Sequence, residues 1–265
     1  VRYTAAGAFD TTFTPIRRTP AAGCTNIYTA GSNSTMSRNI RRNAGLHFVE
    51  NLTTQDISNE NVFFIINRER RDRNMIYGFT EDGSECIFAL GNQTRGAHVF
   101  DIDVKIIGGT PYLFSAGRIR GGGFFRSCNL TTMACNQQNF GRGLISSFMR
   151  MSVNNEGTIV YMTDRRDGSI QGRRLVASNG ALGLDAEVRR CDRAESPNLT
   201  SEMAYATTVA VSPDNSNILY VGSHINHSLQ KLELSGTGAD TTYNVITSVG
   251  TGLNSTLANT GVAGE

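Results

Sequence analysis

The 265-residue sequence has no tryptophan, five prolines, four histidines and only two lysines. No run of 18 apolar residues occurs, so we predict neither a transmembrane helix nor direct insertion into a membrane. No stretch shows convincing helical periodicity. The net charge of +2 argues against a surface for polyanions in general. Because aromatic residues are also not interleaved with basic ones, we expect no nucleic-acid partner.

Several motifs of catalysis and metal binding are missing as well. The G-x-S-x-G turn of serine hydrolases is absent, and so is the S-x-D-x-G-x-T-W box of sialidases, which the lack of tryptophan rules out. The acidic segments Glu81-Asp82-Gly83, Asp101-Ile-Asp103 and Asp214-Asn215 are interpreted as turns and lack a calcium-loop pattern. His224 and His227 have no cysteine or glutamate nearby, so a structural loop is favoured over a metal site. We predict no catalytic residue, no metal ligand and no cofactor.

Short β-branched and aromatic runs, separated by Gly, Asn, Asp and Ser, are abundant instead, which indicates an all-β protein. Five of them share one pattern: an apolar strand with an aromatic anchor, a polar loop, and a second strand about ten residues after the anchor. The five stretches are 25–42, 61–79, 110–128, 158–175 and 217–234, with the anchors Tyr28, Phe64, Phe114, Tyr161 and Tyr220. A preceding strand is visible before three of them, starting at Leu46, Phe148 and Thr208.

The anchors lie 36, 50, 47 and 59 residues apart. A period near 40–50 residues with three or four strands per unit is typical of β-propeller blades, which pack around an axis because one blade cannot bury both of its faces. We therefore predict a single β-propeller domain over residues 1–265, with about five to six blades of three to four antiparallel strands. A β-sandwich is the alternative, although it would not repeat this pattern five times.

Residues 208–234, TVAVSPDNSNILYVGSHINHSLQKLEL, resemble an NHL-type propeller repeat or its YVTN relatives. Ala210-Val211, Tyr220-Val221 and Asn226-His227 match the pattern of that family. The aspartate that follows the tyrosine in the family is Ser223 here, whereas the fourth stretch has it as Asp164. The repeat ending is echoed by VITSVGTG at 245–252 and faintly by VRYTAAG at 1–7. The resemblance implies a propeller fold more than any particular function.

Seven N-x-[ST] sequons occur, against about four expected by chance from the composition; they are Asn33, Asn51, Asn92, Asn129, Asn198, Asn226 and Asn254. The five cysteines lack C-x-x-C spacing. Cys128 and Cys135 bracket a short segment with a sequon, which favours a local disulfide. Cys24 with Cys86 is the next choice, and Cys191 would stay free or bond elsewhere. These features favour an extracellular or cell-surface protein, although five buried thiols in the cytosol are the alternative.

Arginine supplies 23 of the 25 basic residues. Three arginine-rich segments occupy the same loop position in consecutive repeats, so in a propeller they would lie on one face and form a basic patch for an acidic glycan or protein. The alternative is solvated loops paired with nearby acids. The candidate binding residues are Arg68, Arg70, Arg71, Arg73, Arg118, Arg120, Arg165 and Arg166.

Together these features predict a non-enzymatic extracellular glycoprotein module for protein or glycan interaction, or a structural component of a surface, matrix or filament assembly that can self-associate. Because the chain starts at Val1 rather than Met and stops where another blade is due, we expect it to be part of a longer protein. The alternatives are a lactonase-like hydrolase or lyase with a metal on the channel axis, and a cytosolic scaffold. A carboxylate–histidine–metal cluster in the channel would favour the enzyme; a channel filled by apolar side chains or water would favour the interaction module.

Overall fold

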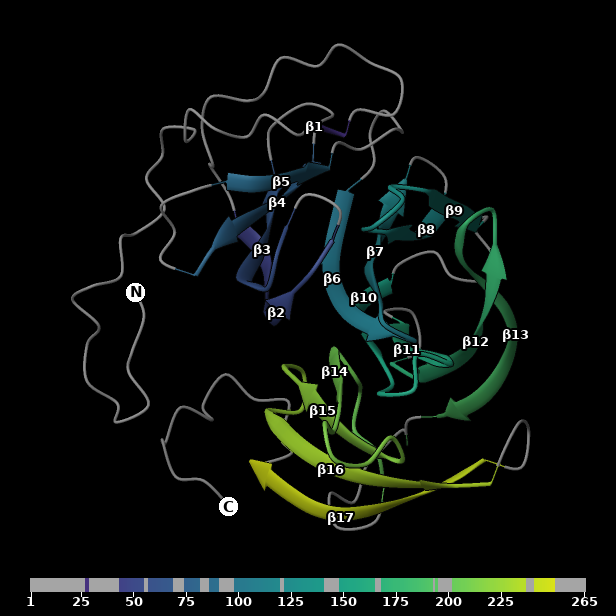
Figure 1. The fold of residues 1–265 in the computed structure, drawn as a ribbon. Helices are drawn as coiled ribbons and strands as arrows, with labels where there is room; N and C mark the ends of the chain where they lie inside the picture. Colours follow the sequence, from purple (N-terminus) through teal and green to yellow (C-terminus); the bar gives the residue numbers. More distant parts are fainter. Residues whose placement is uncertain are drawn as a thin grey trace, which may run out of the picture.

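The structure is a computed structural model, and Figure 1 shows its fold. It describes residues 27–28, 43–54, 57–68, 74–81, 86–90, 98–119, 122–140, 148–164, 168–192, 194, 202–236 and 241–250. Strands and turns make up this part of the chain, and it contains no helix, as the sequence predicts. Within it, therefore, no helix is long and apolar enough to cross a membrane.

The strands form four sheets that follow one another along the chain, each running antiparallel from strand to strand in sequence order. Sheet 1 contains β2 (Asn43–Leu52), β3 (Glu60–Arg68), β4 (Asn74–Thr80) and β5 (Cys86–Leu90). Sheet 2 contains β6 (His98–Ile107), β7 (Thr110–Ile119), β8 (Gly122–Asn129) and β9 (Cys135–Phe140). Sheet 3 contains β10 (Phe148–Val153), β11 (Ile159–Asp164), β12 (Ile170–Ser178) and β13 (Ala181–Cys191). Sheet 4 contains β14 (Thr208–Val211), β15 (Ile218–Ser223), β16 (Ser228–Ser235) and β17 (Thr242–Gly250).

The four sheets lie side by side around a common centre, as the blades of a β-propeller do (Figure 1). The first strand of each sheet is innermost, and β2, β6, β10 and β14 line the centre. The anchors Phe64, Phe114, Tyr161 and Tyr220 all fall in the second strand of their sheets, so the repeat identified in the sequence corresponds to the blade.

The first repeat does not form a blade of its own in the part of the chain that is described. Only Ile27–Tyr28 of it is described; this short strand, β1, pairs in parallel with β5 at the edge of sheet 1. After Tyr28 the repeat is rich in Gly, Ser, Asn and Arg, and this sequence offers few apolar residues for a blade face. The described residues thus contain four blades rather than the expected five to six.

Three apolar cores fill the seams between consecutive sheets. Side chains alternate across a strand, so neighbouring residues serve different seams. In β11, Val160 and Met162 belong to the core shared with sheet 2, whereas Tyr161 belongs to the core shared with sheet 4. In β8, Phe124 faces sheet 1 and Phe125 faces sheet 3. Because sheets 2 and 3 are buried on both faces, successive residues of strands such as β8 and β11 are both apolar.

Sheet 4 has one face that remains exposed. Leu219, Val221 and Leu232 pack against sheet 3, whereas the opposite face carries large apolar side chains in contact with solvent. Its exposed side chains are Tyr220 (38%), Leu229 (52%) and Val249 (39%). Leu229 pairs directly with Val249 across β16 and β17, and Tyr220 pairs with Lys231.

A disulfide closes the β8–β9 hairpin at its tip. The sulfur atoms of Cys128 and Cys135 are bonded at 2.05 Å, and this is the pair favoured by the spacing in the sequence. Between them, the side-chain oxygen of Asn129 accepts hydrogen bonds from the amides of Thr131 (2.9 Å) and Thr132 (3.1 Å). Cys191 is a buried free thiol in the core between sheets 3 and 4, and burial raises its pKa to about 12. It is therefore protonated and unreactive at neutral pH.

Candidate functional site: the central channel

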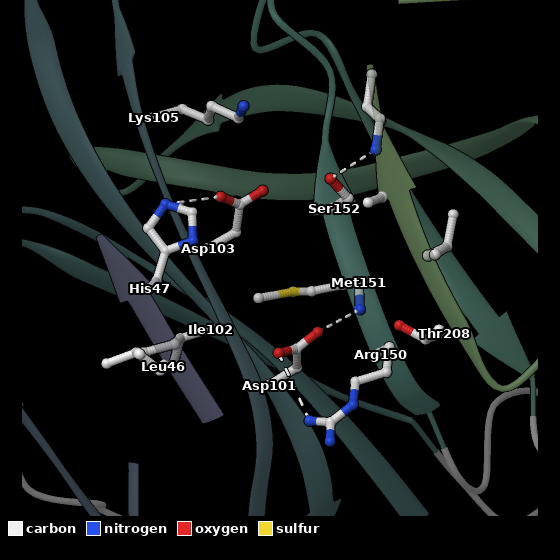
Figure 2. Close-up of a pocket in the computed structure, with 13 residues that line it drawn as sticks. Leu46, His47, Asp101, Ile102, Asp103, Lys105, Arg150, Met151, Ser152 and Thr208 are labelled. Atoms are coloured by element: carbon white, nitrogen blue, oxygen red, sulfur yellow. Dashed lines mark hydrogen bonds and ion pairs between the residues drawn. The ribbon is translucent and has the colours of Figure 1, made fainter. Parts of the chain in front are cut away.

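The inner strands of all four blades surround a cavity of about 470 Å³ at the centre of the propeller (Figure 2). Strands β2, β6, β10 and β14 each contribute lining residues. Five charged or titratable side chains are among them: His47, Asp101, Asp103, Lys105 and Arg150. The channel is therefore polar, and apolar side chains do not fill it.

Two aspartates of the cavity connect sheet 2 to sheet 3. Asp101 and Asp103 lie two residues apart in β6, so their side chains leave the strand on the same side. Asp101 Oδ2 accepts a hydrogen bond from the amide of Met151 at 2.8 Å, and Asp103 Oδ2 accepts one from the amide of Val153 at 2.7 Å. Because β6 and β10 belong to different sheets, these carboxylates bind amides that have no ladder partner on that side.

Ser152 makes the same kind of contact at the seam between sheets 3 and 4. Its hydroxyl oxygen accepts a hydrogen bond of 3.1 Å from the amide of Val211 in β14. Strands β6 and β10 therefore each carry side chains that bind the backbone of the next inner strand, β10 and β14 respectively. This arrangement holds the channel wall in place without a continuous ladder across the blades.

Each aspartate also lies beside a cationic or titratable group. His47 Nε2 is 3.4 Å from Asp103 Oδ1, and Arg150 Nη1 is 3.7 Å from Asp101 Oδ1. Arg150 also donates a hydrogen bond to the carbonyl oxygen of Phe100. Both carboxylates are thus engaged on both oxygens. Lys105 differs, because it forms no ion pair in the part of the chain that the structure describes.

Burial raises the pKa of Asp101 from 3.8 to about 6, although the Met151 amide and the Arg150 guanidinium oppose this shift. An acid whose pKa is higher in the folded state binds more protons there than when unfolded, so its contribution to stability is lost as pH rises. We expect the free energy of unfolding to fall by about 2–3 kcal/mol between pH 4 and pH 7 on account of this group.

The matched variant for this prediction is Asp101→Asn, which keeps an acceptor for Met151 but does not titrate. Urea unfolding at several pH values should give a smaller decline for the variant than for the parent chain. Parallel profiles for the two proteins would contradict the assignment of the pH dependence to Asp101.

The structure describes only part of the arginine patch predicted from the sequence. Arg118 is exposed at the end of β7, opposite His98, and Arg68 is the last residue of β3. The other six candidates lie outside the described residues; they are Arg70, Arg71, Arg73, Arg120, Arg165 and Arg166. The patch therefore stays a prediction.

Three of the seven sequons lie in the described part of the chain. Asn51 is exposed near the end of β2, Asn129 is only 8% exposed, and Asn226 is half-buried. The side-chain oxygen of Asn226 accepts hydrogen bonds from the Tyr205 amide and the Ser223 hydroxyl. Asn33, Asn92, Asn198 and Asn254 lie outside the described residues, as does Cys24, the expected partner of Cys86.

Sequence reasoning did not identify the channel residues as a group. Asp101-Ile-Asp103 was expected in a turn, but both aspartates lie within β6, because alternation with Ile102 and Val104 gives this segment a buried strand face. Among the described residues no group of three His, Cys, Asp or Glu side chains is placed to hold a metal ion. The Asp-x-Asp pattern, alternating with apolar residues, is the one local sequence signal that could have placed these carboxylates on a strand.

Comparison with known proteins gives no family assignment. No protein-family model matches the sequence, and no curated protein sequence matches it significantly. Among solved structures, a Bacteroides uniformis protein with the provisional name 6-phosphogluconolactonase is similar, with a TM-score of 0.51 and 11% identity, over 80% of this chain and 58% of that one. This likeness concerns the fold alone.

Two further structures are similar at lower scores. Hydrazine synthase of Kuenenia stuttgartiensis has a TM-score of 0.46 and 7% identity over 65% of this chain and 55% of that one. The β-propeller domain of Cps50 (Swd1) from Myceliophteria thermophila has a TM-score of 0.44 and 12% identity over 71% of this chain and 56% of that one. The chain thus spans little more than half the length of each of these three proteins.

Proposed function

We propose that the chain is an extracellular, N-glycosylated β-propeller of the NHL-like kind that acts as a non-enzymatic interaction module. It would form one domain over residues 1–265 within a longer protein, with five to six blades in the intact ring. The observation that carries this proposal is how the channel carboxylates are used. Asp101 and Asp103 bind backbone amides of the next blade, so they support the scaffold, whereas a catalytic carboxylate needs an oxygen available to substrate.

A rigid scaffold suits a module that presents its surface to a partner. The seams hold the blades together through buried apolar cores, and the disulfide secures the β8–β9 hairpin. The partner would be a protein or an acidic glycan. The exposed apolar face of sheet 4, with Tyr220, Leu229 and Val249, supports association with a further blade, a partner or another copy of the chain.

The extracellular assignment predicts a specific covalent state. Intact mass of natively produced protein, before and after enzymatic removal of N-glycans, should show the loss of at least one glycan. We expect Asn51 to be modified, because its side chain is exposed, and Asn51→Gln should remove that glycan. Alkylation without reduction should leave Cys128 and Cys135 unmodified. An unmodified mass with five thiols alkylated in denaturant without reduction would instead identify a cytosolic scaffold.

One observation favours the enzyme alternative. His47 lies 3.4 Å from Asp103 and lines the cavity, which is how a histidine base is oriented in many hydrolases. The test is hydrolysis of sugar lactones by the parent chain and by His47→Ala, with and without a metal chelator. No turnover above the uncatalysed rate supports the interaction module. Turnover that His47→Ala abolishes would establish the hydrolase.

A further inference from the structure

Lys105 stands apart from the other charged groups of the channel. The chain contains only two lysines, and Lys105 is the one that lines the cavity. Figure 2 shows its side chain above His47 and Asp103, with the ammonium end directed over the cavity. Since Lys105 has no ion-pair partner in the part of the chain described, three hydrogen-bond donors and a positive charge remain available there.

The acidic groups of the channel do not neutralise this charge locally. Asp103 is engaged by Val153 and His47, and Asp101 by Met151 and Arg150. Their carboxylate oxygens are thus already held by two amides of β10, by the Arg150 guanidinium and by the His47 imidazole, and not by Lys105. An anion entering from solvent therefore meets one available cation and no carboxylate with two unoccupied oxygens.

The rest of the lining suits a hydroxyl-rich molecule rather than a bare anion. Ser152 accepts a hydrogen bond from Val211, so its own hydroxyl proton is available for donation, and Thr208 adds a second hydroxyl. Leu46 and Met151 supply apolar surface against which the C–H face of a sugar ring can pack. A volume of about 470 Å³ exceeds what a single carboxylate group needs.

We propose that the channel binds a sugar acid, with its carboxylate on Lys105 and its hydroxyls toward Ser152 and Thr208. This inference rests on the proposed function and names the class of ligand for it. An acidic protein side chain offers the same carboxylate without the hydroxyls, so it would contact less of the cavity lining. Binding of such a side chain instead of a sugar acid is therefore a separate outcome of the test.

The two lysines allow a direct measurement in the intact chain. Reductive methylation with ¹³C-formaldehyde retains the charge and labels Lys105, Lys231 and the N-terminus, and the variants Lys105→Met and Lys231→Met assign the signals. Titration with glucuronate should shift the Lys105 signal, whereas glucose, which lacks the carboxylate, should not. Lys231 lies on β16, outside the channel, and serves as the internal control.

Lys105→Met should weaken glucuronate binding at least tenfold, as measured by calorimetry, whereas Lys231→Met should leave it unchanged. The proposal is overturned if the Lys105 signal does not move, if Lys231 moves equally, if glucose acts as glucuronate does, or if a glutamate-rich peptide shifts Lys105 and glucuronate does not. Binding of the same variants to immobilised uronate-rich glycan separates the two proposals. Retained glycan binding by Lys105→Met, together with unchanged glucuronate binding, would leave the interaction module intact and remove the channel site.

Discussion

Asp103→Ala is expected to lower the free energy of unfolding by about 3 kcal/mol. The Asp103 carboxylate is buried, and it accepts a hydrogen bond from the amide of Val153 while lying 3.4 Å from His47. Alanine removes both interactions and leaves a buried amide on β10 without its partner, and loss of a charged partner to a buried donor is among the larger single-residue effects. Urea unfolding followed by far-UV circular dichroism measures this change, since the chain has no tryptophan to report it.

Two further variants separate the bridging role from the loss of charge. Asp103→Asn keeps a carbonyl oxygen for the Val153 amide, so it should lose only about 1 kcal/mol. Asp185 is half-exposed and lies 3.8 Å from the equally exposed Arg174; Asp185→Ala should therefore change stability by less than about 0.5 kcal/mol. Equal losses for Asp103→Ala and Asp185→Ala would show that Asp103 does not join the blades.

Phe114→Ala is expected to destabilise the fold by about 4 kcal/mol. Phe114 is fully buried in the core between sheets 2 and 3, and its ring stacks on that of Phe125 with the centroids 6.0 Å apart. Truncation removes the apolar area of the ring and leaves a cavity between two sheets whose backbones are fixed by their ladders. Neither sheet can easily move in to fill this space, so the loss includes the cost of the cavity.

Phe48 provides the matched control for this truncation. It is 37% exposed and its ring lies 4.6 Å from that of Phe63 on sheet 1. Phe48→Ala should therefore lower the free energy of unfolding by about 1 kcal/mol. If both alanine variants lost the same amount, the seam between sheets 2 and 3 would not be the tightly packed core that the burial pattern indicates.

The blade architecture was predictable because it repeats. In sheets 1 to 3 an aromatic residue of the second strand fills a seam, and so Phe64, Phe114 and Tyr161 recur at comparable places before a polar loop. The fourth anchor, Tyr220, has the same place in its sheet but lies on the exposed face. The starts of β10 at Phe148 and β14 at Thr208 were also predicted correctly, since apolar–polar alternation begins there. The described residues contain four blades, and of the first repeat they include only the short strand at Ile27–Tyr28.

The channel was not predictable from the sequence in the same way. His47, Asp103 and Arg150 are separated by about fifty residues each, and they meet only because consecutive inner strands line one axis. Nothing in the local sequence of β6 indicates that its aspartates bind amides of the next blade rather than a cation. The pairing of Cys128 with Cys135 could be predicted, because the two cysteines lie only seven residues apart, on the two strands of one hairpin.

Each of the three seams among the described residues joins a sheet to the one immediately before it in the chain. Such a design makes stability a sum of nearest-neighbour terms, and it lets each blade dock as soon as it leaves the ribosome, onto a blade that is already complete. Ser152 of sheet 3, for instance, meets Val211 only after β14 of sheet 4 has been made. We therefore expect the blades to assemble in the order of their synthesis, so that a defect in sheet 4 leaves sheets 1 to 3 folded.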